Sequence, residues 1–382
     1  MGRRIVILGG GFGGVTAALS LRGALGSEHT ITLVDRRGEF MMGLRTLWVL
    51  VGRATRQEGT RPLTALSARG VDVRRTTVRG IDLRTRTVAT DEAPLPFDYL
   101  VVALGADPRP DLIAGWSPAA CNLYDAEDVE RIVPRIRGLR EGRVHVAVLG
   151  VPYKCPPAPY EAALLLDDLF RRRGLRDGVE IQTSTVQPMS LPAAGPAACA
   201  QVEGQLSRQG IGFAPNRRPV RLEGTTVVYD SGRAEADVLL AVPPHRPPAV
   251  VADSGLALRG EWVQVDPGTL RTSADGVFAV GDVVDIPLPT GLSLPKAGVF
   301  AEAQARVVAG QIVAEITGAR PPAPFDGYGY CFIEMGGERA AMVRGTFYAS
   351  PAPRLEVAPP SAEAYRQKVE FERERLARWF GS

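Results

Sequence analysis

Short apolar runs alternate with helical segments along this chain. Residues 4–8 form a short β-branched run, a glycine-rich loop follows, and residues 15–25 have helical periodicity before a second apolar run at 30–34. Similar runs occur at 97–104, 144–149 and 277–280, and helical periods at 160–173, 298–316 and 361–380. Strands that alternate with helices in this way predict an α/β fold with parallel sheets.

The loop after the first strand has the spacing of a dinucleotide site. Gly9, Gly11 and Gly14 satisfy G-x-G-x-x-G, which gives a tight turn, close approach of a pyrophosphate and close packing of helix on strand. The pyrophosphate would lie at the helix N-terminus. Asp35 ends the second strand, where its carboxylate can accept a hydrogen bond from a ribose hydroxyl. This unit predicts a bound dinucleotide and leaves FAD and NAD both open.

Composition and charge limit the classes of partner that the protein is expected to bind. The 382 residues carry 45 Lys+Arg against 42 Asp+Glu, a net charge of +3, so nucleic acid is not an expected partner. The four cysteines and three histidines show no zinc-ligand spacing, and only three of the basic residues are lysines. No window approaches the roughly 18 uninterrupted apolar residues of a spanning helix. We expect a cytoplasmic protein, with peripheral contact at the inner face of the membrane as an alternative.

Two later strands resemble the second and third FAD signatures of flavoproteins with two dinucleotide domains. One ends in Ala103-Leu104-Gly105 and the other in Gly281-Asp282, whose aspartate holds the ribityl chain in those proteins. The resemblance implies FAD, bound by a domain split into residues 1–110 and 266–318. A second Rossmann-like domain would occupy 111–265, and a C-terminal segment 319–382. The predicted FAD contacts are Gly9, Gly11, Gly14, Asp35, Arg36, Val78, Ala103, Gly105, Gly281, Asp282, Lys296 and Gly298.

The second domain lacks the glycine fingerprint that NADH would require. Its strand at 144–149 continues into a loop with Gly150 as the only glycine and four prolines. Proline has no N–H to offer a phosphate, and its ring obstructs close approach. An NADH donor is therefore disfavoured.

Three segments carry a family resemblance. Lys-Cys-Pro-Pro-Ala-Pro-Tyr-Glu at 154–161 resembles the cysteine motif of the flavoprotein sulfide dehydrogenases, namely sulfide:quinone oxidoreductases and the flavoprotein subunit of flavocytochrome c sulfide dehydrogenase. The segments 294–305 and 329–334 are similar to that family's flavin-covering helix start and to the segment with its second redox cysteine. The resemblance implies that Cys155 and Cys331 form a redox disulfide or polysulfur bridge beside the flavin.

The resemblance also implies roles for three further residues. Cys121 is similar to a third cysteine of the quinone-linked branch, and Glu161 to a glutamate that moves protons near the disulfide. Lys296, with the helix that follows it, would place positive charge at the pyrimidine side of the reduced flavin. The three histidines lie outside these motifs, so the family's histidines have no counterpart.

The function implied is oxidation of a small sulfur nucleophile with transfer of two electrons through FAD to a quinone or another acceptor. Residues 40–50 contain no cysteine, which excludes a mechanism like that of glutathione reductase. Two alternatives stay open, an NAD(P)H-dependent flavin reductase of the same fold and a non-catalytic redox sensor or electron-transfer subunit. The amphipathic helix at 361–380 is expected either to lie on a membrane surface or to pack on its own domain or a second subunit, as in a homodimer.

Overall fold

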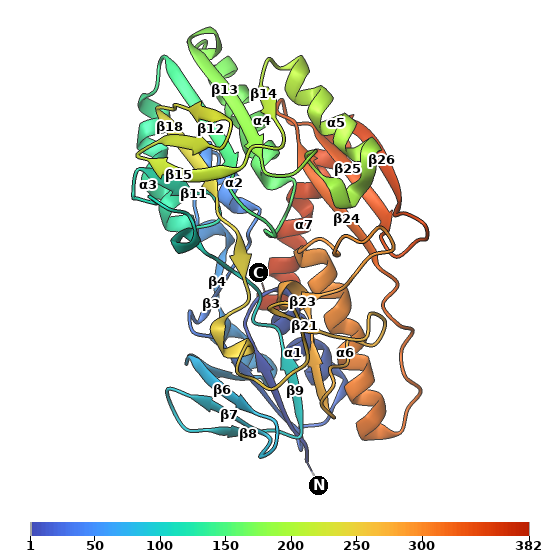
Figure 1. Ribbon diagram of the computed structural model, residues 1–382. Coiled ribbons are helices and arrows are strands. Elements are labelled where there is room, and N and C mark those ends of the chain that lie inside the picture. The colour runs from blue at the N-terminus through green and yellow to red at the C-terminus, as the bar shows by residue number, and fades with distance from the viewer. Residues whose placement is uncertain (1, 382) are drawn as a thin grey trace.

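Two parallel five-stranded sheets organise the computed structural model, which describes residues 2–381 (Figure 1). The first sheet has the order β22-β9-β1-β2-β5, and all its neighbours pair in parallel. Its strands are Val277–Ala279, Tyr99–Val102, Arg4–Leu8, Thr30–Val34 and Asp72–Arg74. The sheet therefore combines strands from two separated parts of the chain. The predicted α/β fold with a split first domain is confirmed.

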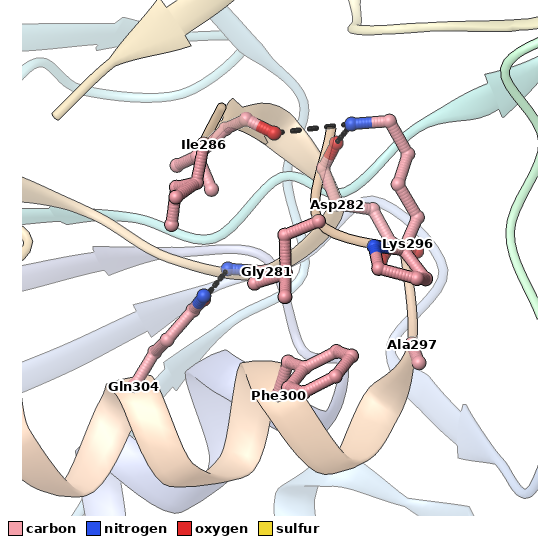
Figure 2. Close-up of a pocket in the computed structure, with 10 residues that line it drawn as sticks. Gly281, Asp282, Ile286, Lys296, Ala297, Phe300 and Gln304 are labelled. Atoms are coloured by element: carbon pink, nitrogen blue, oxygen red, sulfur yellow. Dashed lines mark hydrogen bonds between the residues drawn. The ribbon is translucent and has the colours of Figure 1, made fainter. Parts of the chain in front are cut away.

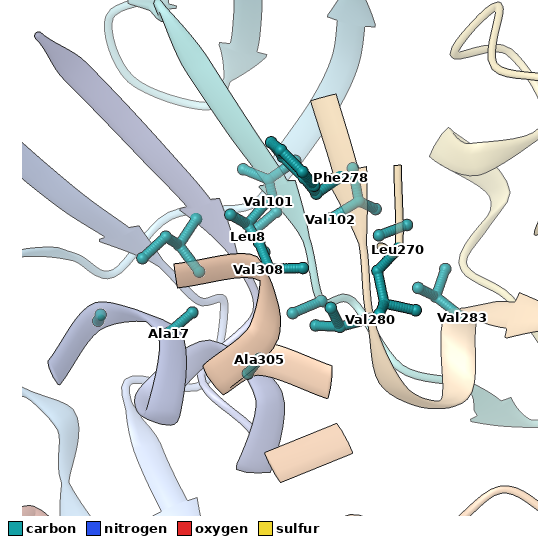
Figure 3. Close-up of a cluster of buried hydrophobic side chains, with 14 of the residues drawn as sticks. Leu8, Ala17, Val101, Val102, Leu270, Phe278, Val280, Val283, Ala305 and Val308 are labelled. Carbon is teal, nitrogen blue, oxygen red and sulfur yellow. The ribbon is translucent and has the colours of Figure 1, made fainter. Parts of the chain in front are cut away.

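The core of the first domain lies between this sheet and two helices. The strands β1 and β9 are almost wholly buried, as expected for a parallel sheet covered on both faces. Helices α1 (Phe12–Ala24) and α6 (Gly298–Thr317) pack against one another on the sheet. Figure 3 shows Leu8, Val101 and Phe278 of the strands packed against Ala17, Ala305 and Val308 of the helices. The small alanines allow the helices to approach the sheet closely.

The second sheet has the order β11-β18-β12-β13-β14, again entirely parallel. Its strands are Ala120–Asn122, Val238–Val242, Gly142–Val148, Val179–Thr185 and Gly212–Ala214. The helices of this domain are α3 (Ala126–Gly138), α4 (Ala158–Arg172) and α5 (Gly195–Arg208). The predicted helix at 160–173 thus begins two residues earlier, because Pro157 and Pro159 are tolerated at the first positions of α4.

The C-terminal segment forms an antiparallel sheet followed by one long helix. Strands β24 (Tyr328–Glu334), β25 (Ala340–Thr346) and β26 (Arg354–Ser361) pair in order, and α7 (Ala362–Phe380) follows directly. The C-terminus lies near the middle of the molecule in Figure 1, close to the first domain. The segment therefore packs against the other two parts of the molecule.

Smaller elements complete the two domains. After β2, strands β3 and β4 form a two-stranded antiparallel sheet, with helix α2 between them along the chain. Strands β6-β7-β8, β15-β16-β17 and β20-β21-β23 form three-stranded sheets. Their bounds are β3 Glu39–Met41, α2 Arg45–Leu50, β4 Thr60–Pro62, β6 Val78–Asp82, β7 Thr87–Thr90, β8 Leu95–Pro96, β15 Pro219–Glu223, β16 Thr226–Tyr229, β17 Gly232–Ala234, β20 Leu258–Arg259, β21 Trp262–Gln264 and β23 Val284–Asp285.

A short ladder joins the two domains where the chain crosses between them. Strand β10 (Asp107–Pro108) leaves the first domain, and β19 (His245–Arg246) returns to it. The two strands pair in antiparallel orientation. Because they follow β9 and β18, the ladder brings the carboxyl ends of both parallel sheets toward one junction, which is where α/β proteins bind ligands.

Candidate active site

The glycine loop after β1 forms a cradle at the N-terminus of α1. Gly9 has φ +102°, a backbone conformation that favours glycine. A Cβ on Gly14 would lie 1.7 Å from the carbonyl oxygen of Gly9, so a larger residue would force helix and strand apart. Gly11 precedes α1 without a side-chain cap, and a Cβ there would meet nothing within 4 Å. The first N–H groups of α1 therefore face open space, where an anion can accept them.

The end of β2 forms one side of this cradle. The Asp35 carboxylate accepts hydrogen bonds from the Gly10 N–H at 2.8 Å and from a second backbone N–H at 2.7 Å. Arg36 turns instead to Asp107, to which its guanidinium donates at 2.8 Å. Val78 is half-buried at the start of β6. Of these three predicted contacts, Asp35 is the one fixed directly against the glycine loop.

The turn after β22 and the start of α6 form a second wall (Figure 2). Gly281 has φ +78°, and its N–H donates to Gln304 Oε1 at 2.7 Å. The next residue, Asp282, has a buried Oδ1 without a hydrogen-bond partner among residues 2–381. Burial raises the pKa of the Asp282 carboxyl. Because a buried polar atom without a partner is costly, this oxygen marks a position for a ligand donor.

Three more predicted contacts lie on the same edge of the first sheet. Ala103 and Gly105 follow β9, and Gly105 has φ +69° with open space where a Cβ would project. Gly298 begins α6, and a Cβ there would come within 2.9 Å of the Phe12 ring. The glycines of this edge thus keep side chains out of the space next to the cradle.

Lys296 holds the second wall together. Its Nζ donates to the carbonyl oxygens of Asp282 at 2.7 Å and Val284 at 3.1 Å, and it lies 3.4 Å from the centroid of the Trp262 ring. Burial lowers the pKa of Lys296 to about 8, although the negative charge of Asp282 acts to raise it. Lys296 therefore positions this turn and adds a buried positive charge to it. No spacing signal in the sequence points to Trp262, because it reaches Lys296 only through the fold.

The loop between β12 and α4 places Cys155 against the first domain. The N–H of Cys155 donates to the carbonyl oxygen of Lys296 at 2.7 Å, and its own carbonyl accepts from the Tyr124 hydroxyl at 3.1 Å. Cys155 has φ +49°, which costs a non-glycine residue roughly 1–2 kcal/mol. Its side chain is exposed. Hydrogen bonds from both domains thus hold this residue at their junction.

Cys331 meets Cys155 at the junction. It lies on β24 opposite Val343 of β25. A hydrogen bond with the Cys155 side chain, together with burial, raises the pKa of the Cys331 thiol. Both cysteines are free thiols. The fold thus brings together the two cysteines that the family resemblance singles out.

A buried ion network lies behind Cys331. Lys368 of α7 is 3% exposed, and its Nζ contacts Glu161 Oε1 and, at 3.1 Å, Glu334 Oε2. The Glu161 charge raises the pKa of the Cys331 thiol, whereas the Lys368 charge lowers it. The network therefore adjusts how easily Cys331 becomes a thiolate. Local sequence patterns do not predict Lys368 and Glu334, because their partners come from distant segments of the chain.

Two cations balance the two carboxylates of this network. Glu334 accepts a hydrogen bond from the Trp48 indole at 2.9 Å and forms a salt bridge with Arg53. Despite burial, the charges of Lys368 and Arg53 hold the pKa of Glu334 below its usual value. Burial raises the pKa of Glu161, and Lys368 offsets only part of that effect. Glu161 is therefore the carboxyl that takes up a proton first.

His245 lies in the same region, although it lies outside the motifs that the sequence analysis identified. Its fully buried ring packs edge-on against Tyr124 with centroids 5.0 Å apart. Nδ1 lies 3.1 Å from the Pro243 carbonyl oxygen, and Nε2 has no partner within the described chain. Burial, reinforced by the charge of Lys154, lowers the pKa of His245 to about 3. The imidazole is thus neutral, and only the pairing of β19 with β10 brings it here.

Cys121 lies in the second sheet. It lies in β11, 1% exposed, and burial raises the pKa of its thiol. The charged groups around it are Asp128, Arg131 and Asp125, and Asp125 caps the N-terminus of α3. The role of Cys121 as a third redox cysteine stays a prediction.

Pro244 packs against the loop after β12, where the second domain would bind a dinucleotide. A Cβ on Gly150 would lie 2.7–3.0 Å from the ring of Pro244. At the start of α4, the Ala158 N–H donates to the carbonyl oxygen of Cys155 at 3.0 Å. The contacts of this loop thus position Cys155, and Pro244 lies against the loop where a pyrophosphate would have to approach.

Helix α7 packs on its own molecule. The Trp379 ring is 2% exposed and lies edge-on to Phe12 and Phe40 with centroids 5.3 Å apart in each pair. Arg375 donates to the buried Glu302 of α6 at 2.8 Å. Trp379, one of the aromatic residues that suggested an interfacial helix, is therefore inside the protein, whereas Tyr365, Phe371 and Phe380 are half-buried. Within residues 2–381, no helix is both long and apolar enough to cross a membrane.

Two sheets with a glycine cradle, an unpartnered aspartate and a dithiol at their junction define a redox protein with two dinucleotide-type domains. The comparison with known families agrees. The chain belongs to the pyridine nucleotide-disulphide oxidoreductase family, whose model matches residues 3–305. It is an FAD-dependent oxidoreductase.

Similar proteins span most of the chain. It is 26% identical over 350 residues to the mitochondrial sulfide:quinone oxidoreductase of Dictyostelium discoideum, covering 86% of this chain and 75% of the relative. It is 28% identical to the demethylphylloquinone reductase of a Synechocystis strain, with 84% and 81% covered. The solved structure of the Aquifex aeolicus sulfide:quinone oxidoreductase superposes with a TM-score of 0.87 at 24% identity, covering 99% of this chain and 91% of that one.

The residues of the first domain fit FAD. The open N-terminus of α1 would hold the pyrophosphate, and Asp35 lies where the adenosine ribose would be bound. The buried, unpartnered Oδ1 of Asp282 would accept a hydrogen bond from a ribityl hydroxyl. The cofactor expected from the sequence is therefore consistent with an orphaned polar atom and an open helix terminus in the structure.

Proposed function

We propose that the protein oxidises sulfide, or a related sulfur nucleophile, at the Cys155–Cys331 pair and passes two electrons through FAD to a quinone or another acceptor. The contact between the two thiols, beside the loop that contains Lys296, carries this proposal. The sulfide:quinone oxidoreductases among the relatives support it, since they match most of the chain.

The chemistry at the pair is thiol–disulfide exchange. In the oxidised enzyme, Cys155 and Cys331 share a disulfide, and hydrosulfide attacks one of its sulfurs. A new S–S bond forms, the Cys155–Cys331 bond breaks, and the products are a persulfide on one cysteine and a thiolate on the other. Bound FAD supplies the two-electron acceptor that this thiolate requires.

The buried ion network contains a group that would hold the proton accompanying the sulfur substrate. If Glu161 and Glu334 are both ionised, Lys368 and Arg53 neutralise them, and a thiolate on Cys331 would be left without a counter-charge. Protonation of Glu161 leaves one net positive charge beside that thiolate. Because burial raises the pKa of Glu161, this carboxyl would hold the proton that accompanies the sulfur substrate.

The two alternatives differ in the electron donor and in turnover. An NAD(P)H-dependent reductase would need a nicotinamide site, and Pro244 packs against Gly150 in the loop that would have to hold the dinucleotide phosphates. A redox sensor or electron-transfer subunit would use the same cysteines without steady turnover. The contact of the thiols alone does not separate this last function from the proposed one, so the test has to measure turnover.

Anaerobic titration of the FAD-loaded protein distinguishes the three functions. We expect sulfide to bleach the flavin absorbance near stoichiometry, NADH to leave it unchanged, and a soluble quinone to restore it repeatedly. Bleaching by NADH alone would overturn the proposal. Bleaching by sulfide without reoxidation by any quinone would favour the sensor or electron-transfer function.

Cysteine variants test the pair itself. Cys155→Ser and Cys331→Ser should each abolish bleaching by sulfide, because no disulfide is left to attack, while FAD stays bound. Cys199→Ser is the matched control, since Cys199 is a buried thiol of α5 whose sulfur accepts a hydrogen bond from the Leu191 N–H. Sulfide bleaching that persists in either pair variant would contradict the assignment of Cys155 and Cys331.

A further inference from the structure

We propose that Lys154 reaches across the domain junction and binds the pyrophosphate of FAD, so that the second domain supplies a ligand to the cofactor of the first. This inference goes beyond the proposed function, because it holds for any electron donor and acceptor. The adjacent Cys155 suggests a different role, namely stabilising a thiolate by charge. The two roles predict different results for cofactor binding.

The backbone brings Lys154 to the first domain. The residue immediately after it, Cys155, donates its N–H to the carbonyl oxygen of Lys296 at 2.7 Å. The peptide that follows Lys154 is therefore docked on the segment leading into α6, next to the wall formed by Gly281 and Asp282. A side chain projecting from this position has the cofactor cradle within reach.

The surroundings of Lys154 belong to the first domain. Its side chain is half-buried, and its Nζ forms no hydrogen bond or salt bridge in the part of the chain that the structure describes. The charged groups that influence the pKa of its ammonium include Asp282, Arg37 and Asp107, all of which belong to the first domain. One of these groups, the buried Oδ1 of Asp282, likewise has no hydrogen-bond partner in the described chain.

A single ligand segment would satisfy both groups. Lys154 needs acceptors, and Asp282 needs a donor. Arg37 adds positive charge near Lys154 and, with burial, lowers the pKa of the Lys154 ammonium, whereas Asp282 and Asp107 oppose that shift. Phosphate oxygens between Arg37, Lys154 and the N-terminus of α1 would neutralise the cations, and a ribityl hydroxyl would donate to Asp282. FAD contains these groups in the required order.

Cofactor affinity is the direct test. Apoprotein of the Lys154→Met variant is titrated with FAD, FMN and riboflavin, and the quenching of flavin fluorescence is measured at low and high salt. We expect FAD and FMN to bind about 10- to 100-fold more weakly than to the parent, as for a lost hydrogen bond to a charged group. Riboflavin, which has no phosphate, should bind equally to both proteins. Lys154→Arg should retain most of the FAD affinity.

The controls separate this role from folding and from thiolate support. Arg109→Met removes a positive charge from an exposed residue near β10 that is paired with Asp111, and it should leave FAD affinity unchanged. Circular dichroism identifies a variant that does not fold, and Lys154→Gln then takes the place of Lys154→Met in the same comparison. FAD affinity within twofold of the parent, together with slower alkylation of Cys155, would overturn the proposal in favour of thiolate support.

Discussion

At the residue scale, all three lysines lie at one site. Lys154 and Lys296 flank the cofactor cradle, and Lys368 lies behind Cys331. Sequence reasoning places the first two in motifs and treats the third as part of an amphipathic helix. The structure shows instead that Lys368 is the counter-ion of two buried carboxylates. The positive charge of Lys368 therefore stabilises the fold and also lowers the pKa of the Cys331 thiol.

Removing the Lys368 side chain should therefore lower the stability of the folded protein. We expect Lys368→Met to lower the free energy of unfolding by about 3–5 kcal/mol, because Glu161 and Glu334 are left buried with Arg53 alone. The pKa of Cys331 should rise further, since the Lys368 charge lowers it. Urea unfolding gives the stability, and the pH dependence of Cys331 alkylation in the reduced protein gives the thiol shift.

A second substitution tests whether the unpaired charges cause this loss of stability. Glu161→Gln in the Lys368→Met background removes one unpaired charge and should recover much of the lost stability. Arg366→Met changes the same helix at an exposed residue paired with Glu363, and it should have little effect. A double variant no more stable than Lys368→Met would show that the network does not act through charge compensation.

The residues that the sequence predicts are those whose role depends on local spacing. Gly9, Gly14 and Asp35 follow from one strand, one turn and the next strand, and the structure places them together. His245, Trp262 and Lys368 act across tertiary contacts, so no local pattern identifies them. Cys121 lies buried in β11, and its role as a third redox cysteine stays a prediction.

At the element scale, the predicted helices and strands agree with the structure to within a few residues, because glycines and prolines mark their ends. The segment predicted as a helix at 298–316 is α6, and Gly318 ends it with φ +75°. The small two- and three-stranded sheets are not predicted, since strands as short as β10 and β19 carry no periodic signal.

Three glycines close to or within α1 should respond differently to alanine. Gly14→Ala should destabilise the fold and prevent FAD binding, because its Cβ would collide with the Gly9 carbonyl. Gly11→Ala should leave the fold intact and weaken FAD binding, since its Cβ meets no protein atom and would project into the cradle. Gly23→Ala, in open space within the helix, should stabilise by about 0.5–1 kcal/mol.

Thermal unfolding and flavin content measured on the same three proteins decide this prediction. Full FAD binding by Gly11→Ala would show that the cofactor does not approach α1 closely. An unchanged melting temperature for Gly14→Ala would mean that helix and strand can separate at little cost.

At the scale of the whole molecule, the C-terminal helix connects all three parts of the structure. It contacts α1 and the β24-β25-β26 sheet, and its Lys368 reaches α4 through Glu161. The sequence indicates an amphipathic helix, but amphipathicity alone does not identify the surface that the apolar face covers. Here that surface is Phe12 and Phe40 of the first domain.

Trp379→Ala should therefore affect stability rather than membrane affinity. We expect a loss of about 3–5 kcal/mol, as for a large aromatic side chain removed from a core. Val369→Ala, on the exposed face of the same helix, should be nearly neutral. Chemical unfolding and co-sedimentation with anionic vesicles measure the two effects. Unchanged stability with lost vesicle binding would instead assign α7 to the membrane surface.

The distribution of lysines has a consequence for labelling chemistry. Lys296 and Lys368 are 8% and 3% exposed, and Lys154 is half-buried at the domain junction, so the outer surface carries its positive charge on arginine. Reagents that acylate side-chain amines, including common biotinylation and cross-linking reagents, would find almost no target on that surface. Their reaction would concentrate at Lys154, where its extent reports how the junction between the two domains is occupied.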